Sequence, residues 1–108
     1  MSAVENFLQI DIHQAKQMMA QGGVTIVDVR SPDAYHAGHL HGAVLVTDET
    51  IDKFLADTDK AKPLICYCYH GFSSQSACQF FKQSGFEKVY SVEGGFEAWK
   101  TVYPFINK

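Results

Sequence analysis

The chain is organised around Pro63-Leu64-Ile65-Cys66-Tyr67-Cys68-Tyr69-His70-Gly71-Phe72-Ser73-Ser74, an apolar run that ends on a cysteine and then turns through a glycine. An apolar run of this length is typical of a buried strand in a parallel sheet. The residues that follow have helical spacing, and we expect one helix face to be formed by Ala77, Phe80, Phe81 and Ser84. The stretch therefore predicts a strand, a loop and a helix, with Cys68 where the strand ends.

A cysteine at that place is suited to act as a nucleophile. The first backbone N–H groups of a helix have no partners within the helix, and the helix dipole adds partial positive charge there. Both effects stabilise a thiolate, which is the reactive form of cysteine. The sequence thus predicts a loop that activates Cys68 and can also seat an anion.

Strand and helix patterns alternate along the whole chain. This alternation predicts an α/β fold with a five-stranded, mainly parallel sheet and helices on both faces. The predicted strands cover residues 7–10, 24–30, 43–46, the run that ends at Cys68, and 88–92. The predicted helices are one between the cap Asp11 and Gly22, a short one from the cap Ser31 to about Ala37, one capped by Thr47 or Asp48 that carries Ile51, Phe54 and Leu55 inward, one that follows Cys68 and ends at Gly85, and a last one that carries Phe96, Trp99 and Val102 and stops before Pro104.

The carboxyl ends of three predicted strands carry chemically active residues. They are Arg30, Cys68 and Glu93, the last of which precedes the Gly94-Gly95 turn. Ligands of open parallel sheets bind outside these strand ends. We therefore expect the three residues to converge on one rim of the sheet, with Arg30 and Glu93 at the periphery of a site centred on Cys68.

Arg30 is the only arginine in the chain. We interpret Arg30 and Asp28 as structural, because a single arginine near Asp33 and Glu93 is well placed for an ion-pair network that braces the site. A direct contact of Arg30 with substrate is the less favoured alternative.

Composition restricts the possible functions. With 108 residues, of which 46% are hydrophobic, we expect a single domain that covers residues 1–108. The formal charge of -3 is spread along the chain, so neither nucleic acid nor an anionic membrane is indicated as a partner. No segment has the length to span a bilayer and residues 1–6 lack a signal pattern, so we expect a cytoplasmic protein. The oligomeric state stays open.

The remaining cysteines and histidines have simpler interpretations. The odd number of three cysteines favours free thiols over a disulfide framework. We expect Cys66 and Cys78 to be core residues, with a resolving-thiol role for Cys66 as the minor alternative. His36, His39 and His41 have no zinc-type spacing to the cysteines, so no metal site is expected. His39 is interpreted as a hydrogen-bonded turn residue, and for His70 anion steering and solvent exposure are equally open.

Four motifs carry a resemblance to a known family. They are Asp28-Val29-Arg30-Ser31-Pro32-Asp33-Ala34-Tyr35, then Gly38-His39-Leu40-His41-Gly42-Ala43, then Cys68 in its loop, and finally Glu93-Gly94-Gly95-Phe96-Glu97-Ala98-Trp99. In this order they resemble a rhodanese domain from end to end, and the loop and the ending are similar to those of small single-domain thiosulfate sulfurtransferases.

The resemblance implies double-displacement chemistry without a cofactor. Cys68 would take the outer sulfur of thiosulfate as a persulfide, sulfite would leave, and cyanide, a small thiol or thioredoxin would accept the sulfur. The residues implied to bind substrate are Tyr69, His70, Gly71, Phe72, Ser73 and Ser74, through backbone N–H groups and the two serine hydroxyls.

The loop also departs from related patterns. Many two-domain rhodaneses carry basic residues in this loop, whereas here only His70 is present, so we expect weak thiosulfate binding that depends on backbone dipoles. Cysteine phosphatases place an arginine six residues after the nucleophile, and that residue is Ser74 in this chain, which disfavours phosphatase chemistry. The second hypothesis is a rhodanese-like binding or sulfur-relay module that takes sulfur from a protein partner.

Overall fold

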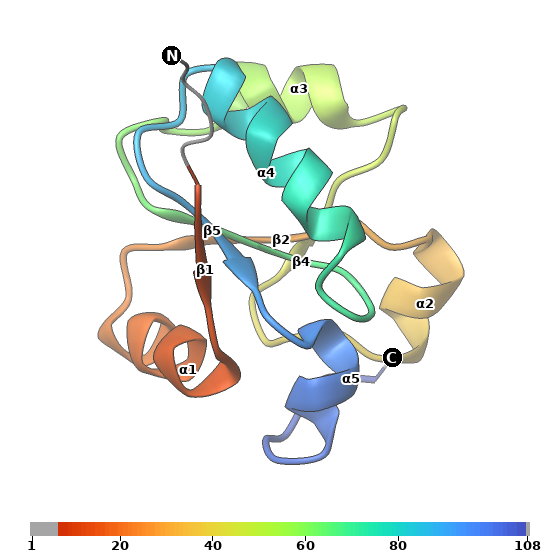
Figure 1. Cartoon of the computed structure of the whole chain (residues 1–108). Helices are drawn as coiled ribbons and strands as arrows, with labels where there is room; N and C mark the ends of the chain where they lie inside the picture. Colours follow the sequence, from red (N-terminus) through yellow and green to blue (C-terminus); the bar gives the residue numbers. More distant parts are fainter. Residues whose placement is uncertain (1–6, 108) are drawn as a thin grey trace.

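The computed structural model describes residues 7–107 and contains five strands and five helices in strict alternation (Figure 1). Each strand is followed by a helix along the chain, as the sequence pattern predicts. The elements are β1 (Leu8–Ile10), α1 (Ile12–Gln21), β2 (Thr25–Asp28), α2 (Pro32–Ala37), β3 (Val44–Leu45), α3 (Ile51–Asp57), β4 (Leu64–Tyr67), α4 (Ser73–Gln83), β5 (Val89–Val92) and α5 (Gly95–Lys100).

The five strands form one parallel sheet in the order β1-β5-β4-β2-β3. The α/β prediction with five parallel strands is therefore confirmed. β4 is central, with Cys66 opposite Val27 of β2 on one side and Ser91 of β5 on the other. All four residues of β4 are buried, which explains why the strand is an uninterrupted apolar run.

Helices cover both faces of the sheet. Figure 1 shows α1 and α5 on one side and α3 and α4 on the other. Successive residues of β4 point to opposite faces, so Tyr67 packs with Phe96 and Trp99 of α5, whereas Cys66 packs with Cys78 and Phe81 of α4. The sheet thus separates two apolar layers. None of the helices in residues 7–107 is long and apolar enough to cross a membrane.

Two of the predicted helix starts are found. The Asp11 side chain accepts a hydrogen bond from Gln14 N–H, and the Gln14 side chain accepts one from Asp11 N–H, which is a complete capping box. Ser31 caps α2 in the same way by accepting from Ala34 N–H.

The predicted cap of α3 is wrong. α3 begins after Thr50, not after Thr47 or Asp48. Thr50 Oγ1 accepts a hydrogen bond from Thr47 N–H at 2.9 Å, so residues 47–50 form a turn that delays the helix.

The apolar face of α4 also differs from the prediction. Its buried residues are Ser74, Cys78 and Phe81, whereas Phe80 is 44% exposed. The reason is that the buried Ser74 fixes the rotation of the helix about its axis, and Phe80, six residues later, lies far from the face that Ser74 and Cys78 share.

All five strands and the last helix are shorter than predicted. β2 ends at Asp28, β3 covers only Val44–Leu45, and β4 ends at Tyr67, directly before Cys68. α5 ends at Lys100, so Val102, predicted inside, lies beyond the helix and is 53% exposed.

Candidate active site

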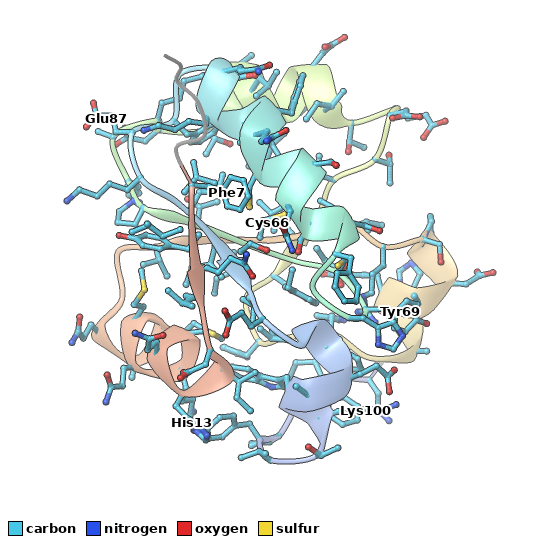
Figure 2. The ribbon with its side chains drawn as sticks, viewed as in Figure 1. Phe7, His13, Cys66, Tyr69, Glu87 and Lys100 are labelled. Atoms are coloured by element: carbon cyan, nitrogen blue, oxygen red, sulfur yellow. The ribbon has the colours of Figure 1, made fainter. Side chains whose placement is uncertain are left out.

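The loop of residues 68–72 connects β4 to α4 at the carboxyl end of the sheet. Figure 2 shows Tyr69 in this loop and Cys66 deeper in the sheet, beneath α4. Cys68 follows the last residue of β4, and its side chain is buried, with 4% of its surface exposed. The loop therefore brings one nearly enclosed sulfur to the rim where the strand ends meet.

Three hydrogen-bonding groups, one from the loop and two from the first turn of α4, surround this sulfur. The N–H groups of Gly71 and Ser74 each donate to Cys68 Sγ at 3.2 Å. Ser74 Oγ lies 3.4 Å from the same sulfur. Two of the N–H groups expected around Cys68, that of Gly71 in the loop and that of Ser74 in α4, therefore lie against its sulfur.

The surroundings of the sulfur favour its ionised form. Burial by itself raises the pKa of Cys68, but hydrogen bonds from the Ser74 hydroxyl and from the N–H groups of Ser74, Gly71 and His70 outweigh it. The pKa of Cys68 is therefore lowered below that of an ordinary cysteine. A lowered pKa means that more of the thiol is ionised at neutral pH.

The start of α5 holds the loop in place. Phe96 N–H donates to Cys68 O at 2.8 Å, and Glu97 N–H donates to Tyr69 O at 3.0 Å. A Cβ on Gly95 would lie 2.5 Å from both of these carbonyl oxygens, so no larger residue fits there. The Gly94-Gly95 turn is thus required for the close approach of α5 to the loop.

A buried ion pair lies next to the loop. Arg30 donates from Nη2 to Asp28 Oδ2 at 2.6 Å, and the exposed fractions of the two side chains are 3% and 0%. Tyr67 donates its hydroxyl to the same Asp28 oxygen at 2.7 Å, and Arg30 lies over the ring of Phe96 at 4.3 Å from its centroid. The structural interpretation of Arg30 and Asp28 agrees with this geometry.

The partners predicted for Arg30 are wrong. Within residues 7–107 its ion pair is with Asp28 alone, and neither Asp33 nor Glu93 takes part. Burial lowers the pKa of Arg30, but hydrogen bonds to Asp28 and the charge of Asp28 outweigh it and raise the pKa. Burial, followed by the charge of Asp28, raises the pKa of Tyr67. The Arg30 guanidinium therefore stays charged and the Tyr67 hydroxyl stays neutral over the whole physiological range.

A pocket of about 280 Å³ opens beside Cys68. Its rim includes the exposed side chains of Tyr69 and Phe72, and Gly71 and Ser74 lie buried behind the sulfur. Glu93 is exposed next to Gly71 and does not line the pocket. The lining residues are Val29, Arg30, Ser31, Cys68, Tyr69, His70, Phe72 and Ser73.

Sequence reasoning missed Ser91 of β5. Its hydroxyl is fully buried and lies 2.8 Å from Ser74 Oγ, so it belongs to the immediate surroundings of the site. A signal was present, because Ser91 is a small polar residue inside a strand that is otherwise buried and apolar at Val89 and Val92.

Of the other cysteines and histidines, His70 lines the pocket beside Cys68, whereas Cys66 and Cys78 lie in the core. A hydrogen bond with Cys78, together with burial, raises the pKa of Cys66 well above its ordinary value, as fits two core thiols. His39 stacks on Tyr35 and bonds Tyr35 O through Nδ1 at 2.8 Å, which agrees with a turn role. His70 is exposed at the pocket. Within the described part of the chain, no three histidine, cysteine or acidic side chains are grouped as a metal site.

Comparison with solved structures identifies the same fold in several bacterial and archaeal proteins. The rhodanese-like domain of an Anabaena protein, solved by NMR, shares 27% identity over 93% of this chain and 79% of that one, with a TM-score of 0.83. A rhodanese-like domain protein from Staphylococcus aureus shares 26% identity over 94% of this chain and 99% of that one, with a TM-score of 0.79.

A Rhodopseudomonas palustris protein described as of unknown function and a possible tyrosine phosphatase shares 24% identity, with a TM-score of 0.78, over 93% of this chain and 85% of that one. At this identity the likeness extends to the fold alone. Residues 11–101, which include every element from α1 to α5, match the family described as the rhodanese-like domain. The chain belongs to the rhodanese-like domain family.

Proposed function

We propose that the chain is a sulfurtransferase that carries sulfane sulfur as a persulfide on Cys68. The observation that supports this most strongly is the sulfur itself, which two backbone N–H groups and a hydroxyl surround at a loop without lysine, arginine, aspartate or glutamate. Such donors stabilise a thiolate and, once it has reacted, the negative charge that is passed between sulfur atoms.

The proposed reaction has two halves. The Cys68 thiolate attacks the outer sulfur of thiosulfate, the Sγ–S bond forms, and the S–S bond of thiosulfate breaks with its electron pair on the departing sulfite. An acceptor, cyanide or a thiol, then attacks the outer persulfide sulfur. The Sγ–S bond breaks, and its electron pair returns to Cys68 as thiolate, so no external oxidant or reductant is needed.

Initial-rate kinetics test this function directly. We expect thiocyanate to form from thiosulfate and cyanide, with parallel lines in double-reciprocal plots, because sulfite leaves before cyanide binds. Intersecting lines would mean that both substrates bind together, and they would contradict a free persulfide intermediate.

The lowered pKa of Cys68 predicts the pH dependence of the first half-reaction. Thiolate is the reacting form, so the rate falls as the pH drops through the pKa of Cys68 and is level above it. The midpoint should lie below the value of about 8.5 for a free cysteine. The midpoint is measured from the rate of sulfite release in a single turnover at a series of pH values. A midpoint at or above about 8.5 would contradict the proposed stabilisation of the Cys68 thiolate.

Phosphatase chemistry is not favoured by the site. The position that would carry the phosphate-binding arginine is Ser74, whose side chain faces Cys68 Sγ. Arg30 does reach the pocket, but its Nε and Nη2 donate to Asp28 and Gly38 O. A guanidinium held in this way does not offer a fork to a phosphate.

The second candidate is a sulfur relay between proteins, and a surface beside the pocket favours it. A groove of about 650 Å³ shares Val29, Arg30 and Ser31 with the Cys68 pocket. Its lining includes Phe80 and the exposed Asp48 and Glu49. Phe72, at the pocket, is 76% exposed. A segment of a partner protein with apolar and basic residues matches this surface better than free thiosulfate, which is a dianion.

Two synthetic cysteine peptides distinguish the candidates. The two peptides share their apolar residues, but one carries lysines and the other glutamates. The protein is first treated with polysulfide to form the Cys68 persulfide, and the transfer of sulfur from it to each peptide is then measured. For a relay we expect the lysine peptide to react on the order of ten-fold faster at low salt. The double variant Asp48→Lys, Glu49→Lys should reverse this preference and leave transfer to a small neutral thiol unchanged. Equal rates for the two peptides would exclude the groove as a docking site.

A further inference from the structure

Ser91 lies at the inner end of a chain of hydrogen-bonding groups that reaches the reactive sulfur. Its Oγ is 2.8 Å from Ser74 Oγ, which is 3.4 Å from Cys68 Sγ. Both serines are fully buried. Among the residues that the structure describes, Ser74 is the one hydrogen-bond partner of the Ser91 hydroxyl. The series of hydrogen-bonding groups thus runs from Ser91 of β5 through Ser74, in the first turn of α4, to Cys68.

Counting protons shows which protonation state of the Cys68 sulfur this series of hydrogen-bonding groups favours. When Cys68 is a thiol, Cys68 Sγ, Ser74 Oγ and Ser91 Oγ carry one proton each. Only two contacts join these three atoms, so one proton has no acceptor among them. With Cys68 as a thiolate, two protons serve two contacts. A buried donor without an acceptor is unfavourable, so the arrangement favours the thiolate.

The same count fixes the direction of both hydrogen bonds in the thiolate state. Ser74 has one proton, and it must point to the sulfur if it is to stabilise negative charge there. Its contact with Ser91 can then be made only if Ser91 donates. Without Ser91, the Ser74 hydroxyl is free to rotate away from Cys68 and loses the polarisation that a donated hydrogen bond supplies.

We propose that Ser91 is a positioning residue, which holds the Ser74 hydroxyl as a donor to the Cys68 sulfur. The proposal deepens the proposed function, since it assigns to β5 a role in activating the thiolate. Ser91 also acts in the second half-reaction. There the breaking Sγ–S bond returns its electron pair to Cys68, and the Ser74 hydroxyl that Ser91 holds stabilises the leaving Cys68 sulfur.

Other ionisable groups near Cys68 are the same in wild type and in Ser91 variants. They come from each element that packs around the loop, so a change on substitution of Ser91 reports on the hydroxyl chain. They are Asp28 at the end of β2 and its partner Arg30 after that strand, Cys66 of β4, Tyr69 and His70 of the loop, Cys78 of α4, Glu93 after β5, and Glu97 of α5.

The test measures the pKa of Cys68 from its rate of alkylation by iodoacetamide at different pH values, read by peptide mass spectrometry. We expect Ser91→Ala to raise this pKa by roughly half to one unit and to slow alkylation below the pKa roughly three- to ten-fold. Ser91→Thr, which keeps the hydroxyl, should restore most of the wild-type value. An unchanged pKa in Ser91→Ala would overturn the proposal.

A double-mutant cycle shows whether Ser91 acts through Ser74. In a Ser74→Ala background we expect Ser91→Ala to leave the pKa of Cys68 unchanged, because the intermediate hydroxyl is gone. A shift of the same size in both backgrounds would overturn the proposal. Urea unfolding of each variant confirms that the comparison is made on folded protein. Alkylation uses no sulfur donor, so the role of Ser91 can fail while sulfur transfer succeeds, and the reverse.

Discussion

We expect Cys68→Ser to lose all of the proposed transfer of sulfur from thiosulfate to cyanide, to the level of a reaction without protein. The hydroxyl of serine is a far weaker nucleophile than a thiolate, and the donors around Cys68 stabilise a charge that serine does not carry at neutral pH. The measurement is the initial rate of thiocyanate formation. Since serine is close to cysteine in size, we expect the variant to fold.

Cys78→Ala is the matched control. Cys78 lies on the buried face of α4 next to Cys66 and is not part of the site, so this variant should keep most of the wild-type rate. Loss of turnover in Cys78→Ala with turnover retained in Cys68→Ser would place the reactive sulfur in the core and contradict the account.

Asp28→Ala is expected to lower the free energy of unfolding by about 3–5 kcal/mol. The substitution leaves the guanidinium of Arg30 buried without its counter-charge and removes the acceptor of the Tyr67 hydroxyl. A loss of this size is a large part of the stability of an ordinary domain, about 5–15 kcal/mol. Urea denaturation followed by circular dichroism measures it.

Asp48→Ala provides the comparison for that experiment. Asp48 is exposed, so its removal should change the free energy of unfolding by no more than about 0.5 kcal/mol. If Asp28→Ala cost no more than Asp48→Ala, the buried pair would not brace the strand ends, and Arg30 would have to be reconsidered as a substrate contact.

The order of the elements and the place of Cys68 could be predicted because they depend on local patterns. The alternation of apolar runs and caps is set within each segment, and the Asp11 capping box and the Ser31 cap are found where the pattern put them. Cys68 could be found because an apolar run ends on it and a glycine follows two residues after Tyr69. These signals need no knowledge of what lies across the sheet.

One error depends on a contact between distant segments. Phe80 was expected inside because it is apolar, but the rotation of α4 is set by Ser74, which contacts Cys68 and, 17 positions along the chain, Ser91. A polar residue that fixes a buried face is invisible to a count of apolar positions. The composition of β5 marks Ser91 as unusual, but its contact with Ser74 depends on how β5 and α4 pack.

The partner of Arg30 could have been found from the sequence. Alternate residues of a strand point to the same face, so Asp28 was placed beside Arg30 by spacing alone. The prediction instead gave weight to carboxylates of other segments, Asp33 and Glu93, whose distance from Arg30 depends on the tertiary fold. Local geometry decided the pairing.

The central claim is that Cys68 carries a persulfide, and intact-mass spectrometry tests it most directly. The protein is treated with thiosulfate, measured, then treated with cyanide and measured again, alongside Cys68→Ser. We expect wild type to gain the mass of one sulfur atom and to lose it to cyanide, while the variant gains none. Wild type that stays unmodified would contradict thiosulfate as the donor, and a sulfur gained equally by Cys68→Ser would contradict Cys68 as its carrier.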